Sequence, residues 1–165
     1  MNTIVMKFGG TSVAGTKKLR NIADIVIKEV KNHKIIVVLS AMAGETNKLQ
    51  SYLDDFASQY SLESDLVLTS GEQVTIGLLS AELKNKGIKS IPLLGWQIPI
   101  ITDDSHEKAK ILHIDNKRIE KFFEKNDVIV LAGFQGISLD GEITSLGRGG
   151  SDTTAVAIAS SVGAK

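Results

Sequence analysis

The chain has 165 residues, with 19 lysines and arginines against 19 aspartates and glutamates, and it contains no cysteine. This length allows one ordinary domain with a sizeable core. The balanced charge argues against nucleic acid or an anionic membrane as a partner, and the lack of cysteine excludes disulfides and thiolate chemistry. No apolar run approaches the length of a membrane span and no signal pattern opens the chain, so we expect a soluble cytoplasmic protein.

Strand-like and helix-like segments alternate in the first half of the chain. Apolar runs predict strands at 3–8 and 34–39, and the second is apolar enough to be buried on both faces of a sheet. Apolar residues at helical spacing predict three helices. These are marked by Leu19, Ile22, Ala23, Val26 and Val30, by Leu49, Leu53, Phe56 and Tyr60, and by Val74, Leu78, Leu79 and Leu83.

The second half continues this alternation. Strands are predicted at 88–94, where Pro92 suits an edge, at 98–102 and at 127–132, with a charged surface helix at 115–124. Asp140-Gly141 predicts a hairpin turn, and 152–162 predicts a helix that is apolar on more than one face and needs cover on both sides. The element order predicts an α/β fold, a three-layer α/β/α sandwich with a mainly parallel sheet.

Polar and glycine-rich segments follow several of the predicted strands. Ligands of such sheets bind at the carboxyl ends of the strands, so we expect these segments to meet in one crevice. Ser70-Gly71-Glu72 opens a helix whose start could face the same crevice. The segments at strand ends are 7–12, 40–46, 133–136 and 146–152.

The segment 146–152 is the most informative. Its glycines allow close approach of the backbone, and the start of the following helix offers free N–H groups to an anion. Arg148 adds a planar fork that matches a carboxylate or phosphate, and Asp152 adds an acid among these donors. We interpret this loop as the holder of a small anionic substrate. The alternative is that Arg148 and Asp152 pair with each other on the surface.

Three further residues carry a functional and a structural interpretation each. Lys7 stands beside Gly9-Gly10, as a cation that grips a phosphoryl group would, although the pattern is neither a Walker loop nor a dinucleotide fingerprint. The alternative is a lysine that points to solvent. Glu72 and Thr46 could bind a ligand or only cap the helices that they open. The three histidines lack metal-ligand spacing and are interpreted as surface or loop residues.

Together these segments resemble the aspartate kinases of the amino-acid kinase superfamily. The similarity runs in order through nearly the whole chain, and its first and last motifs are the most diagnostic. The matching motifs are Lys7 to Val13, Ser40-Ala41-Met42 with Thr46, Ser70 to Gln73, Gly95-Trp96-Gln97, Gly133 to Gly136 and Leu146 to Asp152.

The resemblance implies a role for each motif. Lys7 would contact the transferring phosphoryl group, and Asp152 would orient the phosphate-binding cations. Lys7, Phe8, Gly9, Gly10 and Ser12 would line the phosphate site of ATP, which brings Mg²⁺ with it, and the protein holds no metal of its own. The residues implied for L-aspartate are Thr46, Glu72, which would lie near the ammonium, Arg148, Gly149, Gly150 and Ser151.

The resemblance also implies that 1–165 is an incomplete amino-acid kinase domain, without the segments that complete the nucleotide pocket and without regulatory domains. We therefore expect a homo-oligomer or completion by a complementary downstream polypeptide, and an exposed apolar patch on the isolated chain. Two alternatives stay open. The chain could be a non-catalytic remnant, or it could be another kinase of the superfamily that acts on a different carboxylate or on a nucleotide.

Overall fold

The computed structural model describes residues 2–56 and 61–164, and its centre is a parallel four-stranded sheet. Every neighbouring pair in this sheet is parallel, as expected for strands that read as almost continuous apolar runs. β3 contains Pro92 and lies at an edge, as the sequence predicted. In spatial order the strands are β1 (Asn2–Phe8), β2 (His33–Leu39), β6 (Val128–Ala132) and β3 (Ser90–Leu93).

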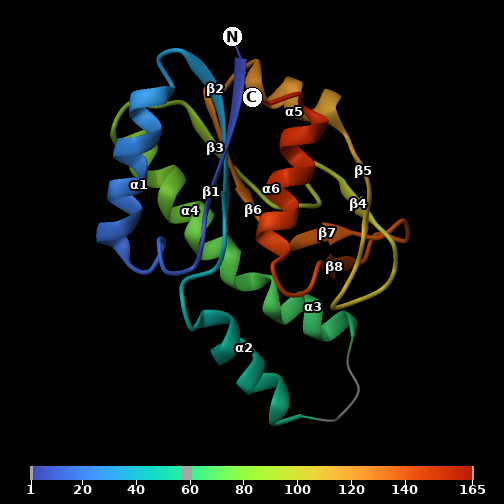
Figure 1. Cartoon of the computed structure of the whole chain (residues 1–165). Helices are drawn as coiled ribbons and strands as arrows, with labels where there is room; N and C mark the ends of the chain where they lie inside the picture. Colours follow the sequence, from blue (N-terminus) through green and yellow to red (C-terminus); the bar gives the residue numbers. More distant parts are fainter. Residues whose placement is uncertain (1, 57–60, 165) are drawn as a thin grey trace.

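Helices cover both faces of the sheet (Figure 1). Alternate residues of β2 explain this arrangement, because Ile35 and Val37 join one core cluster while Ile36 and Val38 join the other. The first cluster includes α1 (Thr16–Glu29) and α4 (Ser70–Asn85). The second includes α5 (Asn116–Phe123) and α6 (Gly150–Ser161). The three-layer α/β/α sandwich is therefore confirmed.

A smaller mixed sheet extends the fold beside the carboxyl ends of β6 and β3. Its strands pair in the order β5-β4-β7-β8, with β4 and β7 parallel and the outer pairs antiparallel. Gly141 has φ 86° in the turn between β7 and β8, so the predicted hairpin is confirmed. The bounds are β4 (Ile100–Thr102), β5 (Ile111–Ile114), β7 (Gln135–Ile137) and β8 (Ile143–Ser145).

Two helices lie beyond the carboxyl ends of the parallel strands, α2 (Glu45–Asp54) and α3 (Leu62–Leu68) (Figure 1). The sequence analysis extended the second helix too far, since α2 ends at Asp54 and Phe56 is 80 % exposed; Tyr60 lies outside the described residues. It missed α3 and β5, which are too short to show a clear period. On α4, Leu79 and Leu83 are buried as expected, whereas Val74 and Leu78, which also marked this helix, are 55 % and 40 % exposed.

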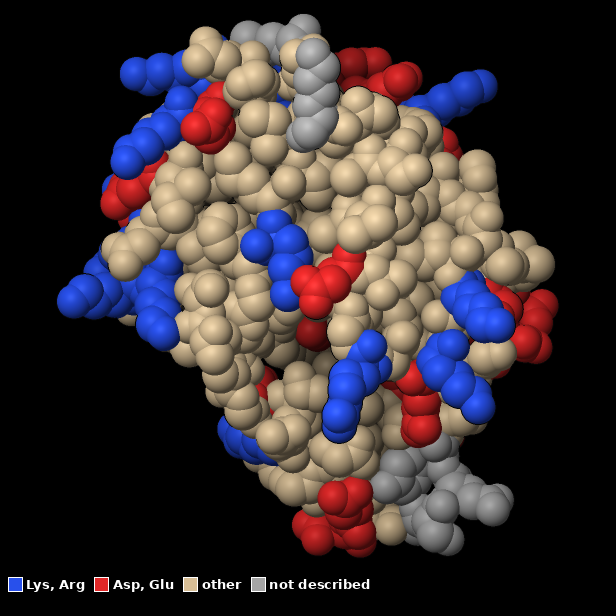
Figure 2. Space-filling view, viewed as in Figure 1, with Lys and Arg blue, Asp and Glu red and all other residues tan. Residues whose placement is uncertain are grey.

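The last helix is buried on one face only. Ala155 and Ile158 pack into the second core cluster, whereas Val156 is 71 % exposed. Figure 2 shows basic and acidic side chains interleaved over one face of the molecule, as the balanced composition predicts. No helix in residues 2–56 and 61–164 combines the length and the apolar character needed to cross a membrane.

His106 is a loop residue, as the sequence predicted, but two acids hold its side chain, which the sequence did not predict. It stands in the turn between β4 and β5, but its side chain is only 12 % exposed. Its Nδ1 lies 2.7 Å from Oδ2 of Asp65, and its Nε2 lies 3.3 Å from Oε2 of Glu142. Sequence spacing could not reveal these contacts, because the partners lie 41 and 36 residues away.

We expect Gly133→Ala to destabilise the protein by about 1–3 kcal/mol, because an added Cβ would lie 2.7 Å from Oγ and 2.9 Å from Cα of Ser151. Gly77→Ala is the matched control. Gly77 lies inside α4 with open space around it, so alanine there should stabilise the helix by about 0.5–1 kcal/mol. Urea unfolding of both variants measures the difference, and equal stability of the two would contradict this packing.

Candidate functional site

A cleft of about 310 Å³ lies where the strand ends converge, and it brings together most of the residues singled out from the sequence. It is bounded by the ends of β1 and β2 and by the starts of α4 and α6. Figure 2 shows a hollow near the centre of the visible face, with side chains of both charges on its rim. Its lining comprises Lys7, Gly10, Ser40 to Gly44, Thr46, Glu72, Phe134 and Gly147 to Asp152.

Lys7 reaches this cleft from the end of β1 and does not point to open solvent. Its Nζ lies 2.8 Å from Oδ1 of Asp152, and the two side chains are 26 % and 69 % exposed. Asp152 therefore pairs with Lys7, and the alternative surface pair between Arg148 and Asp152 is wrong. The ion pair places a cation and an acid together in the cleft, and the ammonium keeps further N–H donors for a phosphate.

Glu72 places a carboxylate on the inner wall of the cleft. It belongs to the first turn of α4 and is 3 % exposed, and its Oε1 accepts a hydrogen bond of 3.1 Å from Ala41 N–H. Its Oε2 is buried and has no hydrogen-bond partner among the described residues. Burial raises the pKa of Glu72 from 4.5 to about 7, and backbone hydrogen bonds from Ala41 and Glu72 itself offset only part of this rise.

The loop that leads into α6 has the geometry expected of an anion holder. Gly147 and Gly149 have φ of 74° and 76°, a backbone conformation that residues with a Cβ rarely adopt. Within the described part of the chain, the N–H groups of Gly149 and Ser151 have no protein acceptor. These donors, the start of the twelve-residue helix and the exposed Arg148 make this end of the cleft electropositive.

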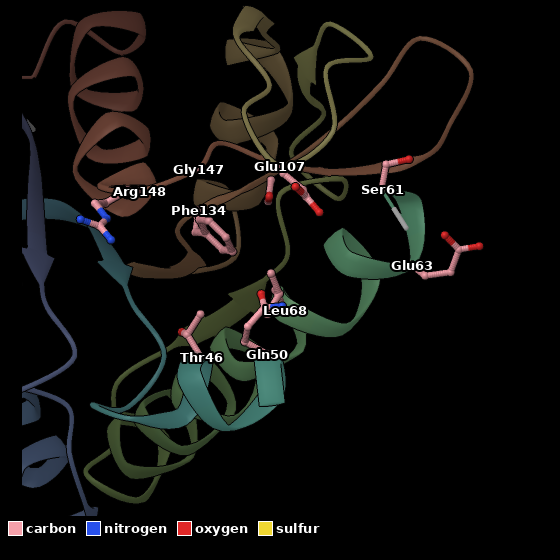
Figure 3. Close-up of a pocket in the computed structure, with 10 residues that line it drawn as sticks. Thr46, Gln50, Ser61, Glu63, Leu68, Glu107, Phe134, Gly147 and Arg148 are labelled. Atoms are coloured by element: carbon pink, nitrogen blue, oxygen red, sulfur yellow. The ribbon is translucent and has the colours of Figure 1, made fainter. Parts of the chain in front are cut away.

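Phe134 lines this cleft and also a wider one of about 990 Å³, which shares Thr46 and Arg148 with it. Figure 3 shows the phenyl ring in the middle of the wider cleft, with Arg148 on one side and Thr46 and Gln50 below it. Its φ of 72° is unusual for a bulky residue and costs of the order of 1 kcal/mol. Two hydrogen bonds hold this conformation. The Phe134 N–H donates to Thr154 Oγ1, and the Phe134 carbonyl accepts from the Leu146 N–H.

Most of the residues predicted for the site line the clefts, and the others lie outside them. Thr46 lines both clefts and lies inside α2, whose N-cap is Gly44, so the capping alternative for Thr46 is wrong. Glu72 likewise binds the loop after β2 and is not the N-cap of α4, which is Thr69. Gly10, Gly149, Gly150 and Ser151 line the smaller cleft.

The remaining predicted phosphate-site residues lie outside the lining of the cleft. Phe8 packs against the first core cluster, and Ser12 is exposed in the loop before α1, where its N–H donates to Gly9 O. Gly9 stays close to the site, since a Cβ there would lie 3.4 Å from Lys7 Nζ. Their roles toward a phosphate remain predictions. The sequence analysis expected 133–136 at the crevice but assigned no role to Phe134, because nothing in the sequence signals its left-handed backbone.

The comparisons with known proteins agree with this geometry. The model of the amino acid kinase family matches residues 2–165. The chain belongs to the amino acid kinase family. The matched range includes every residue of the cleft, so the site just described is a site of an amino acid kinase domain.

Relatives of this amino acid kinase domain include several aspartokinases. The aspartokinase of Geobacillus stearothermophilus is 44 % identical over 167 residues, which cover 100 % of this chain and 41 % of the relative. Aspartokinase 2 of Bacillus subtilis is 46 % identical over 98 % of this chain and 40 % of its own length. The chain thus spans about two fifths of the length of these curated relatives.

Solved structures show the same fold. The aspartate kinase of Synechocystis superposes with a TM-score of 0.81 at 35 % identity, over 99 % of this chain and 27 % of that protein. Aspartokinase III of E. coli in complex with aspartate and ADP superposes with a TM-score of 0.84 over 98 % of this chain and 47 % of that protein. At 24 % identity, the second similarity supports the fold alone.

We expect the unliganded protein to lose stability as the pH rises from about 4.5 to about 7, because the unfolded chain ionises Glu72 in this range whereas burial keeps Glu72 protonated in the native state. The loss should reach about 3 kcal/mol and should be absent from Glu72→Gln. Urea unfolding at both ends of this range measures it. Glu120→Gln, which changes an exposed carboxylate of α5, should keep the wild-type pH dependence. A Glu72→Gln variant that loses the same stability would contradict the assignment.

Proposed function

We propose that this chain binds L-aspartate and the phosphates of ATP, and that it provides the aspartate-binding part of an aspartate kinase. In that reaction an oxygen of the side-chain carboxylate attacks the γ-phosphorus of ATP. The bond to the β–γ bridging oxygen breaks, and ADP leaves with the electron pair. The products are 4-phospho-L-aspartate and ADP. The identities of 44–46 % with aspartokinases support this reaction over those of other members of the family.

The buried Oε2 of Glu72 is the observation that carries the proposal. A buried carboxylate oxygen without a donor is costly, and the ammonium of an amino acid would give it the missing hydrogen bond. Arg148 lines the same cleft, with a fork that matches a carboxylate. A group for an ammonium and a group for a carboxylate in one cleft favour an amino-acid substrate over a nucleotide or a simple carboxylic acid.

The phosphoryl group would enter at Lys7. The aspartate side chain is ionised at neutral pH and needs no general base, so catalysis reduces to bringing two anions together and neutralising their charge. Lys7 Nζ and the free N–H groups before α6 supply positive charge for this purpose. Asp152, 2.8 Å from Lys7, would hold the ammonium in place and orient it toward the phosphate.

ATP would bring Mg²⁺ with its phosphates. Among the described residues, no group of three or more acidic, histidine or cysteine side chains is placed to hold a metal ion, so a magnesium ion shared with the nucleotide suits this cleft. The proposed homo-oligomer, or completion by another polypeptide, remains a prediction.

Calorimetric titration of the chain with L-aspartate and with succinate tests the proposal. Succinate keeps both carboxylates but lacks the ammonium, so we expect aspartate to bind more tightly by about tenfold or more. Glu72→Gln should remove most of this preference. A kinase assay with hydroxylamine as a trap for acyl phosphate then separates an active kinase from a binding domain that transfers no phosphate. A wild-type chain that binds neither acid would refute the proposed function.

We expect Arg148→Ala to weaken aspartate binding by about 10- to 100-fold, because the fork supplies charge-assisted hydrogen bonds to one carboxylate. Arg148→Lys keeps the charge without the fork, so its affinity for aspartate should lie between those of the wild type and Arg148→Ala. Lys7→Ala should chiefly lower kcat, by about 100-fold or more, in the enzyme of which this chain is part. Titration and steady-state kinetics measure the two effects. Unchanged aspartate binding by Arg148→Ala would contradict the assignment.

A further inference from the structure

Asp65 in α3 is a buried carboxylate outside the cleft that binds two other parts of the chain. It is 0 % exposed, and His106 Nδ1 lies 2.7 Å from its Oδ2. The Glu107 N–H donates to both carboxylate oxygens, at 3.1 and 3.2 Å, and the Ser145 hydroxyl donates to Oδ1. So many donors around one acid offset the cost of burying it, and they tie α3, the turn at 104–108 and β8 together.

The turn held by Asp65 packs directly against the loop that bears Arg148. A Cβ on Gly147 would lie 2.9 Å from the Glu107 carbonyl oxygen, so the two backbones are in close contact (Figure 3). Glu107 itself has φ 65°, a strained conformation for a residue with a side chain. Its N–H bonds to Asp65 hold that conformation. The position of Gly147, and hence of the next residue, Arg148, therefore depends on the Asp65 carboxylate.

Asp65 also fixes the start of α4. The Asp65 carbonyl accepts hydrogen bonds from the Thr69 N–H, at 3.1 Å, and from the Thr69 hydroxyl, at 2.6 Å. Thr69 is the N-cap of α4, three residues before Glu72, and its carbonyl accepts from Gln135 Nε2 at 3.2 Å. α3 therefore connects the position of Glu72 to that of the turn that supports Arg148.

We propose that Asp65 and His106 are positioning residues that set the separation between Glu72 and Arg148, and with it the fit of the cleft to its amino-acid substrate. This inference rests on the proposed function for the identity of that substrate. Neither side chain lines either cleft. They act through the backbone of the turn at 104–108 and through α3.

The charge on His106 is part of this arrangement. The acids that hydrogen-bond to its ring are Asp65 from α3 and Glu142 from the hairpin of β7 and β8. Burial lowers the pKa of His106, but the bonds to these two acids outweigh burial and raise the pKa above its usual value. The charged ring therefore donates to both acids below the ordinary histidine pKa, and as the pH rises through the raised pKa the ring loses its charge and one of its two donors.

Variants of His106 test the inference, since removing Asp65 itself could prevent folding. His106→Ala should raise the Kd for L-aspartate by about tenfold, because a charge-assisted hydrogen bond to the buried acid is lost. His106→Asn carries an amide nitrogen close to the place of Nδ1 and should restore part of the affinity. Asp127→Asn is the matched control, because it breaks the 3.1 Å ion pair with Lys34 at the opposite end of the sheet. Its Kd should stay within about twofold of wild type.

Backbone amide NMR signals separate this inference from the proposed function, because they need no ligand. The Gly147 and Arg148 signals should titrate with the His106 ring in the wild-type chain and in Asp127→Asn, but not in His106→Ala. If the wild-type chain binds no aspartate while this titration is present, the proposed function fails and the positioning role stands. The positioning role would be overturned if the Gly147 and Arg148 signals changed neither with pH nor on loss of His106. An unchanged Kd for L-aspartate in His106→Ala would also overturn it.

Discussion

A carboxylate that is buried before its partner arrives is the constraint on which this site depends. Glu72 lies under the ends of β1 and β2, with one oxygen bonded to Ala41 and the other without a donor among the described residues. Other contacts of α4 offset the free energy needed to bury this carboxylate. The helix packs into the first core cluster, and the Thr75 hydroxyl donates to Ser40 O at 2.9 Å. An exposed glutamate would hold an ammonium only weakly, because water would compete for it.

The positive groups follow a different design from the buried acid. Lys7 and Arg148 are partly or fully open to solvent, and Lys7 is already neutralised by Asp152. This division suits a reaction between two anions. In the proposed reaction, the ammonium of the substrate would meet a fixed, desolvated carboxylate, whereas the anionic groups would meet solvent-accessible cations. The glycine loop before α6 adds backbone N–H donors to these cations.

The sequence predicted the layered fold and the convergence of the site, because both follow from local patterns. The β-branched run of β2 and the glycine motifs at strand ends mark the sheet and its carboxyl edge directly. It missed what depends on long-range contact. Asp65 meets Ser145 across 80 residues, and the left-handed backbone of Phe134 arises from its bonds to Thr154 and Leu146. Short elements such as α3 and β5 leave no readable period, so their contribution is visible only in the folded chain.

The unsatisfied oxygen of Glu72 has a consequence for the life of the protein in the cell. A ligand that completes its hydrogen bonds binds the native state and not the unfolded chain, so each occupied molecule is more stable than an empty one. Proteolysis acts on the small open population, which shrinks as occupancy rises. Under the proposed function, the abundance of this protein would thus follow the supply of its amino-acid ligand.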